Sequence, residues 1–231
     1  MKLNVNLTDS FNYTKLLFND LGKLVILAIL NVIPIVNFIV FGYLGNVMKQ
    51  SENSNQLPAL ENYGELWVQG LKMLLSMVAL MIIPILLAGP ALITLVVSQL
   101  GLSEWVGPLF GLVVMIPLLY IGLALAFFIG CIAIMGLVNM VRNNANIFKA
   151  FEFSKSMAII SRIGWGGYII WLAVLFIGSM VISAVMGNIP VIGGLLGLLI
   201  APIIGIFVAR SASLVYTEGT SQTTVTPTEQ V

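Results

Sequence analysis

The chain of 231 residues is 59% hydrophobic and only 8% charged, whereas about 25% of the residues in an ordinary soluble domain are charged. Ten basic and nine acidic residues leave a net charge of +1, so there is no charge excess to attract nucleic acid or acidic partners. Composition therefore excludes a water-soluble protein, and the length leaves no room for a separate soluble module beside a membrane domain.

Four stretches of the chain carry no charged residue. They are 25, 31, 37 and 47 residues long and cover residues 24–48, 73–103, 105–141 and 163–209. A helix of about 20 apolar residues crosses the roughly 30 Å hydrocarbon core of a bilayer. The predicted fold class is therefore an all-α polytopic transmembrane bundle in the cell membrane. We expect four long spanning helices at about residues 74–98, 108–140, 164–186 and 190–213.

The first charge-free run permits two topologies. If it crosses once as a kinked helix, Lys2, Lys15 and Lys23 lie on the opposite side from the other seven basic residues. If the chain turns back at residues 31–37, all ten lie on one side, as expected for cytoplasmic loops. The arms of such a hairpin, 10 and 14 residues long, are shorter than a full span. Charge segregation favours the hairpin with both termini cytoplasmic, and the single crossing stays open.

Three amphipathic segments precede the hydrophobic runs, at residues 8–23, 57–72 and 146–162. In the second segment Pro58 suits the first turn of a helix. Aromatic side chains gather at the headgroup level of membranes, so these segments are interpreted as interfacial helices anchored by Trp67, Phe151 and Trp165. The alternative is that they are linker helices packed on their own protein.

The chain is expected to form one transmembrane domain over residues 1–216. Residues 217–231 are rich in Thr, Ser and Gln and contain almost no apolar side chain. Such a segment cannot bury enough surface to fold. We therefore predict a short disordered polar tail.

Few residues could carry chemistry. The chain has no histidine and a single cysteine, Cys131, which lies in the third apolar run and is interpreted as a packing residue. Glu61 and Glu65 are one helical turn apart, but they fall on the solvated face of an amphipathic segment, whereas acid–base catalysis needs a desolvated or coupled pair. We therefore expect no enzyme, no cofactor and no metal site.

Several uncharged polar residues are expected at membrane depth: Asn31, Asn37, Gln99, Asn139 and Asn188. None is ionisable at neutral pH, which disfavours a proton relay or a coupled ion site. Polar residues near helix ends or prolines can also serve as caps and as partners for freed backbone groups. That interpretation is preferred for those near the end of a run.

The last apolar run has a small residue at every fourth position. These residues form a stripe along one face of the predicted helix: Gly193, Gly197, Ala201, Gly205, Ala209 and Ser213. Small residues let membrane helices approach closely. The stripe therefore predicts a packing face, whose partner is another helix of this chain or a second copy.

Short motifs in the first seventy residues resemble those of an uncharacterised family of prokaryotic membrane proteins that is commonest in archaea. The matching residues are Phe11-Asn12-Tyr13, Gly42-Tyr43, Leu57-Pro58, Gly64 and Gly70-Leu71. The layout is also similar to the membrane domains fused to some bacterial glycerophosphodiester phosphodiesterases. The resemblance implies an architecture, but no activity and no catalytic residues.

The function expected from these features is non-enzymatic association with membrane lipids, with other membrane proteins or with a second copy, without nucleic acid or metal. Interfacial segments and small-residue faces favour this hypothesis. The alternative is a channel or facilitator for a small neutral or apolar solute. Proline and glycine breaks together with Asn residues at membrane depth motivate that alternative.

Overall fold

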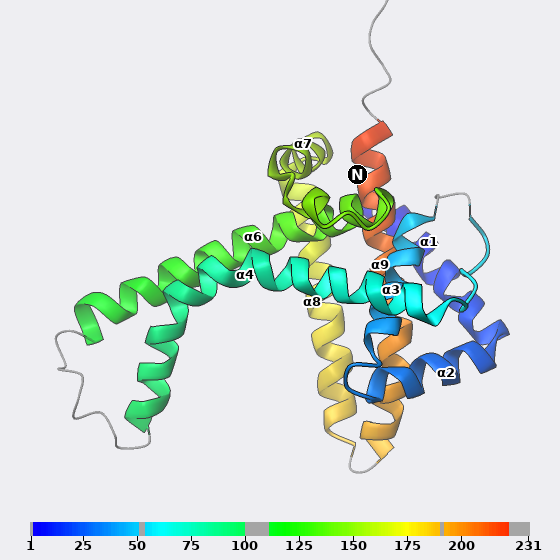
Figure 1. Ribbon diagram of the computed structural model, residues 1–231, viewed down its shortest axis with the longest axis horizontal. Coiled ribbons are helices and arrows are strands. Elements are labelled where there is room, and N and C mark those ends of the chain that lie inside the picture. The colour runs from blue at the N-terminus through cyan, green and yellow to red at the C-terminus, as the bar shows by residue number, and fades with distance from the viewer. Residues whose placement is uncertain (1, 51–53, 100–110, 190–191, 222–231) are drawn as a thin grey trace, which may run out of the picture.

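The computed structural model describes residues 2–50, 54–99, 111–189 and 192–221. Every regular element in these ranges is helical (Figure 1). Four helices are long and apolar enough to cross a membrane, at Tyr63–Val97, Val113–Arg142, Trp165–Gly187 and Leu196–Ser221. The predicted fold class, an all-helical membrane protein with four long apolar helices and shorter apolar helices beside them, is confirmed.

The N-terminal region consists of short helices. The helix α1 (Leu3–Lys15) leads into the 3-10 turn η1 (Leu16–Asn19), which is followed by α2 (Leu21–Val32) and α3 (Phe38–Lys49). The amphipathic segment expected at residues 8–23 is therefore interrupted. The interruption falls at Asp20, whose carboxylate accepts a hydrogen bond from the Lys23 amide and caps α2.

The chain turns at residues 33–37, as the hairpin topology requires. Both arms are 12 residues long, about 18 Å each, which is too short to cross a bilayer alone. The arms also diverge, because α2 packs mainly on α9 (Ile192–Ser221), whereas α3 packs mainly on α4 (Tyr63–Gln99). The structure thus has the turn of the predicted hairpin without the side-by-side packing of its arms.

The helix α4 is continuous from Tyr63 to Gln99. The prediction of a separate interfacial helix beginning at Pro58 is wrong: residues 54–62 are not helical, and the amphipathic residues that follow form the first turns of the long helix itself. Pro84 and Pro90 lie inside α4, and the helix changes direction in its second half (Figure 1).

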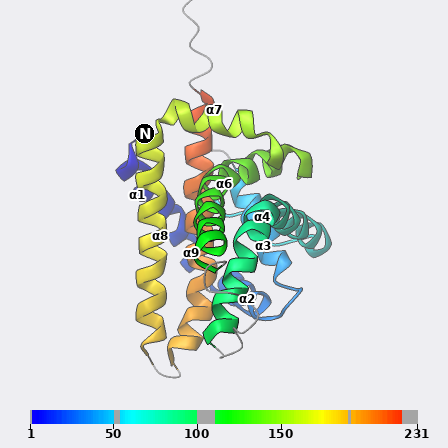
Figure 2. The ribbon, with the colours of Figure 1, turned by 90° about the vertical axis from the view of Figure 1, so that its left-hand side faces the viewer.

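Two apolar hairpins dominate the molecule. In the first, α4 pairs with α6 (Ile116–Arg142), which is preceded by the π-helical turn η3 (Gly111–Met115). In the second, α8 (Trp165–Gly187) pairs with α9. The hairpins run in different directions from a shared base (Figures 1 and 2).

The C-terminal helix is longer than expected. The helix α9 continues to Ser221, so residues 217–221 are helical and do not belong to the predicted disordered tail. Residues 222–231 lie outside the described residues. The N-terminal helix α1 packs along the same α9, so the first and last described segments of the chain lie together (Figure 1).

The connection between the hairpins contains the 3-10 turn η4 (Ile147–Phe151) and the helix α7 (Phe153–Ile163), with Glu152 between them. The single amphipathic helix expected at residues 146–162 is therefore two elements. The apolar face of α7, formed by Ile159, Ile160 and Ile163, is buried against α6 and α9. This packing is what the alternative of a linker helix on its own protein predicts.

The core lies at the shared base, where α3, α6, α8 and α9 meet. Its largest fully buried side chains include Trp171, Tyr43, Tyr168 and Met135. Beside this core, glycine lets α3 approach α4 closely: a Cβ added at Gly42 would come within 1.9 Å of the Leu66 carbonyl oxygen. Such contact between backbones is the packing mode expected of membrane helices.

Candidate functional site

Three residues of the motifs that resemble the family, Tyr13, Tyr43 and Pro58, meet at the connection before α4. The Tyr43 hydroxyl and the Lys23 ammonium group donate to the Pro58 carbonyl, at 3.4 and 3.3 Å. The Tyr13 hydroxyl donates to the Gln50 side chain and, at 3.3 Å, to the Gln56 carbonyl. Burial raises the pKa of Tyr13 to about 12, so its hydroxyl stays protonated and remains a donor. Tyr13 and Tyr43 of the motifs, together with Lys23, tie α1, α3 and α2 to one connection.

A buried cation joins α1 to α9. The Arg210 side chain is 1% exposed, and its Nε atom donates to the Asp9 carboxylate at 2.8 Å. The guanidinium carbon also lies 4.6 Å from the centre of the Tyr13 ring, a cation–π distance. Because an unpaired buried charge is costly, this pair fixes the position of α1 on α9.

A chain of hydrogen bonds next to this ion pair joins α8 as well. The Trp171 indole nitrogen donates to the Ser211 hydroxyl at 2.7 Å, and that hydroxyl donates to the Asn6 side chain. The Asn6 amide returns a bond of 3.1 Å to the Ser211 carbonyl. Trp171 and Ser211 are fully buried, so these bonds form where competing water is excluded.

A second polar cluster joins α6 to α9. Arg142 donates to the Met48 carbonyl and to the hydroxyls of Ser213 and Thr217, and its guanidinium lies 4.9 Å from the Tyr216 ring. Asn139 is fully buried and accepts from the Tyr216 hydroxyl at 2.8 Å. The two clusters fix the ends of α1, α6 and α9 at the base.

An apolar groove lies between α1, α8 and α9. Its volume is about 390 Å³. Apolar side chains from these helices and from η1 form most of its lining, among them Leu7, Phe11, Phe18, Val174, Ile203 and Phe207. Among the described residues of the lining, Lys15 carries the one charged side chain.

A second apolar groove lies on the other side of α8, between α8 and α6. Its volume is about 580 Å³, and its lining includes Phe127 and Gly130 from α6 together with Ile169 and Phe176 from α8. Ser179 borders both grooves. Only 6% of the most apolar stretch of α8 is buried within the chain, compared with 44% in α6 and in α9. Most of α8 therefore presents apolar side chains that no described part of the chain covers.

The small-residue stripe of α9 is divided between several surroundings. A Cβ at Gly193 would come within 2.0 Å of the Met186 carbonyl oxygen of α8, and one at Gly205 would meet Leu44 of α3. Nothing lies within 4 Å of a Cβ at Gly197, and Ala201 is exposed. Ala209 and Ser213 are buried, and the Ser213 hydroxyl donates to the Met48 carbonyl at 3.0 Å. The stripe does not act as one continuous packing face within the chain.

The polar residues expected at membrane depth do not form one site. Asn139 is the centre of the buried cluster at the base, whereas Asn188 is exposed and bonds the Ala184 carbonyl at the end of α8. The Asn37 side-chain oxygen is buried with no hydrogen-bond partner in the described part of the chain, and Asn31 is half-buried. The side chain of Gln99 lies outside the described residues. Among the four whose side chains are described, Asn188 is the one that bonds a carbonyl at the end of its own helix.

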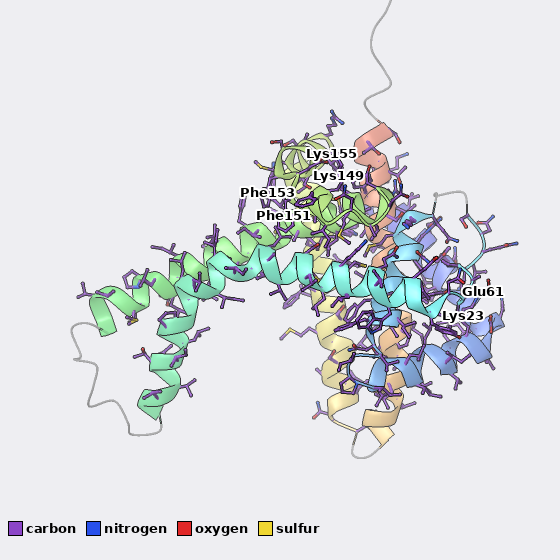
Figure 3. The ribbon with its side chains drawn as sticks, in the orientation of Figure 1. Lys23, Glu61, Lys149, Phe151, Phe153 and Lys155 are labelled. Atoms are coloured by element: carbon purple, nitrogen blue, oxygen red, sulfur yellow. The ribbon has the colours of Figure 1, made fainter. Side chains whose placement is uncertain are left out.

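The three expected anchors all contact their own protein. The Trp67 indole donates to the Ile35 carbonyl at 2.9 Å, where Ile35 has a φ of 71° in the turn between α2 and α3. Trp165 stacks on Phe128 of α6, with ring centres 6.0 Å apart. Phe151 is half-buried against the core, beside the lysines of η4 and α7 (Figure 3).

The sequence did not reveal the Asp9–Arg210 pair, because Arg210 entered the topology argument only as one of the seven basic residues after the first charge-free run. A usable signal was present, because Arg210 falls inside the last predicted spanning helix, directly after the longest charge-free run. A charged residue in such a helix implies a partner. The identity of that partner, 201 positions earlier in the chain, could not be deduced from spacing.

Comparison with known proteins gives a family without an assigned activity. A model of the family described as a protein of unknown function, DUF4013, matches residues 26–191. No curated protein and no solved structure matches the chain. The matched range contains α4, α6 and α8, and it excludes α1 and the whole of α9.

Proposed function

Because the chain belongs to the DUF4013 family, whose function is unknown, we propose from its own geometry that it is a non-catalytic membrane protein that binds lipid acyl chains in the two grooves beside α8. The observation that carries this proposal is the pair of apolar grooves on either side of an almost uncovered helix. Both grooves fall within the volume range of about 300–1,000 Å³ that is usual for ligand pockets.

The lining of the grooves supports an apolar ligand over a polar solute. The second groove is bordered by aliphatic and aromatic side chains, with Ser179 and Cys131 as its weakly polar members. A polar solute there would lose its hydrogen bonds to water without gaining replacements. An acyl chain loses none, and it contacts apolar atoms along its whole length.

Glycine positions on α8 provide a direct test. Nothing lies within 4 Å of a Cβ at Gly178, which lines the first groove, or at Gly167, which lines neither groove. Gly178→Leu should therefore occupy the groove without disturbing the fold, and Gly167→Leu is its matched control on the same helix. Native mass spectrometry during stepwise delipidation should show less retained lipid for Gly178→Leu than for wild type or Gly167→Leu.

Two results would overturn the proposal. One is equal lipid retention by Gly178→Leu, Gly167→Leu and wild type. The other is saturable flux of a small solute into liposomes that contain only this protein, which would favour a channel or facilitator. Thermal unfolding of both variants in detergent verifies that neither has lost its fold.

The proposal includes an orientation with both termini in the cytoplasm. It is supported by the basic residues at the edge formed by η4 and α7 (Figure 3) and by the absence of charge from the described part of the turn between α8 and α9. The test uses Cys131→Ala with Ser221→Cys or Ser103→Cys. An impermeant thiol reagent applied to intact cells should label only the Ser103 position, and labelling of the Ser221 position would reverse the orientation.

A further inference from the structure

Lys15 is a cation at the border of an apolar groove. It lies at the end of α1, its side chain lines the groove between α1, α8 and α9, and it is exposed. Its ammonium group lies 4.4 Å from the centre of the Phe11 ring. Among the described residues no carboxylate pairs with it. A cation–π contact alone is a weak partner for an ammonium group at an apolar surface.

The carboxylates nearest in the sequence are already engaged. Asp9 pairs with Arg210, and Asp20 pairs with Lys23 at 3.4 Å. The hydrogen bond from the Lys23 amide holds the pKa of Asp20 below its usual value, so this carboxylate stays ionised beside Lys23. The local charge balance therefore leaves Lys15 with no anion from this part of the chain.

The groove begins where a polar edge of the protein meets an apolar one. On the polar side, Lys15 is exposed, and Asn19 and Asp20 directly follow Phe18 of the groove lining along the chain. On the apolar side, Phe11 and Phe18 flank Lys15 and lead to Ile203 and Phe207 of α9. A phospholipid has the same division between its charged phosphate and its acyl chains.

We propose that this groove binds an anionic phospholipid, with one acyl chain between α1, α8 and α9 and the phosphate paired with Lys15. The proposal rests on the lipid-binding function proposed above and adds the lipid class. The bound phosphate supplies the anion that Lys15 lacks, and the long side chain of Lys15 can extend toward the headgroup level. A zwitterionic lipid satisfies Lys15 less well, because its own cation competes for the phosphate.

The experiment uses native mass spectrometry of the full chain in nanodiscs with equal amounts of phosphatidylglycerol and phosphatidylcholine of the same chain length. Wild type should retain about five times as much phosphatidylglycerol as phosphatidylcholine, the effect expected of one lysine near an anionic surface. Lys15→Gln should lose this preference while still retaining lipid, and Lys15→Arg should keep it. Gly178→Leu should retain less lipid of both kinds, because it fills this groove and leaves the groove between α8 and α6 open.

A matched control separates a specific contact from general surface charge. Lys155 is exposed on α7 and lines neither groove, so Lys155→Gln removes the same charge elsewhere and should leave the preference unchanged. If Lys155→Gln and Lys15→Gln lost the preference for phosphatidylglycerol equally, the pairing of the phosphate with Lys15 would be overturned. Lipid retained by wild type without any preference would overturn the lipid class alone, whereas no lipid retained by any form would overturn the proposed function itself.

Discussion

Gly70 of α4 lies directly against the backbone of Phe38 in α3: a Cβ atom added at Gly70 would come within 1.9 Å of the Phe38 carbonyl oxygen. Backbone atoms cannot move aside as a flexible side chain can. Gly70→Ala should therefore push α3 away from α4 and lower the free energy of unfolding by about 1–3 kcal/mol, the usual cost of overpacking. Thermal unfolding in detergent, followed by circular dichroism, measures the change.

The control for that substitution lies on the same helix. Nothing lies within 4 Å of a Cβ at Gly64, and alanine is the better helix former, so Gly64→Ala should be neutral or stabilise by up to about 1 kcal/mol. Equal unfolding temperatures for both alanine variants would show that the helices do not approach at Gly70.

The ion pair between Asp9 and Arg210 predicts a non-additive double substitution. Asp9→Asn removes the charge beside a fully buried guanidinium and should destabilise the protein by roughly 1–3 kcal/mol. Adding Arg210→Met removes the buried charge as well. The double variant should therefore lose less unfolding free energy than the sum of the two single losses. Unfolding of all four proteins completes the cycle. Simple additivity would mean that the two side chains do not interact.

The α9 stripe predicts different responses at two of its positions. Gly205→Leu should be destabilising by about 1–3 kcal/mol, because a Cβ there already approaches Leu44 to 3.0 Å. A Cβ at Gly197 meets no described atom within 4 Å, so Gly197→Leu should leave the stability of the protein unchanged. Assembly size by light scattering is measured alongside unfolding, because a loss of assembly in Gly197→Leu alone would assign that position to contact with a second copy.

Acid should weaken the contacts around η4. The hydrogen bonds from Lys149 and Asn139 hold the pKa of Glu152 below its ordinary value of 4.5. The folded pKa is the lower one, so the stabilisation is present above about pH 4.5 and is lost as the pH falls through the folded pKa. Wild type should therefore be more stable than Glu152→Gln at neutral pH. The difference in unfolding temperature between wild type and Glu152→Gln should shrink as the pH falls below about 4.5. A difference that stays constant with pH would contradict a stabilising role of the Glu152 carboxylate.

Hydropathy was sufficient to predict the long helices, because an apolar run of this length without charge is typical of a helix that spans the hydrocarbon core of a bilayer. It could not show that residues 57–72 divide between an irregular connection and the first turns of α4. Their apolar residues recur at helical spacing, and yet Pro58 serves as an acceptor for Tyr43 and Lys23. That role depends on tertiary contacts, which periodicity does not report.

The candidate sites were less predictable than the fold. The stripe on α9 predicts close packing, but spacing alone cannot reveal that Gly205 faces Leu44 while Gly197 faces open space. The grooves beside α8 depend on how α1 and α6 lie on either side of it. Similarly, no local pattern distinguishes Lys15, which lacks a carboxylate partner in the described part of the chain, from Lys23, which has one.

The pairing of α1 with α9 has a consequence for the order of assembly during synthesis. Asn6 and Ser211 are separated by 205 positions, so a ribosome releases α1 long before its partner exists. The hairpin of α4 and α6 can form while translation continues, whereas α1 must wait for the final helix. A nascent chain halted before Arg210 should therefore expose α1 to protease, and completion of the chain should protect it.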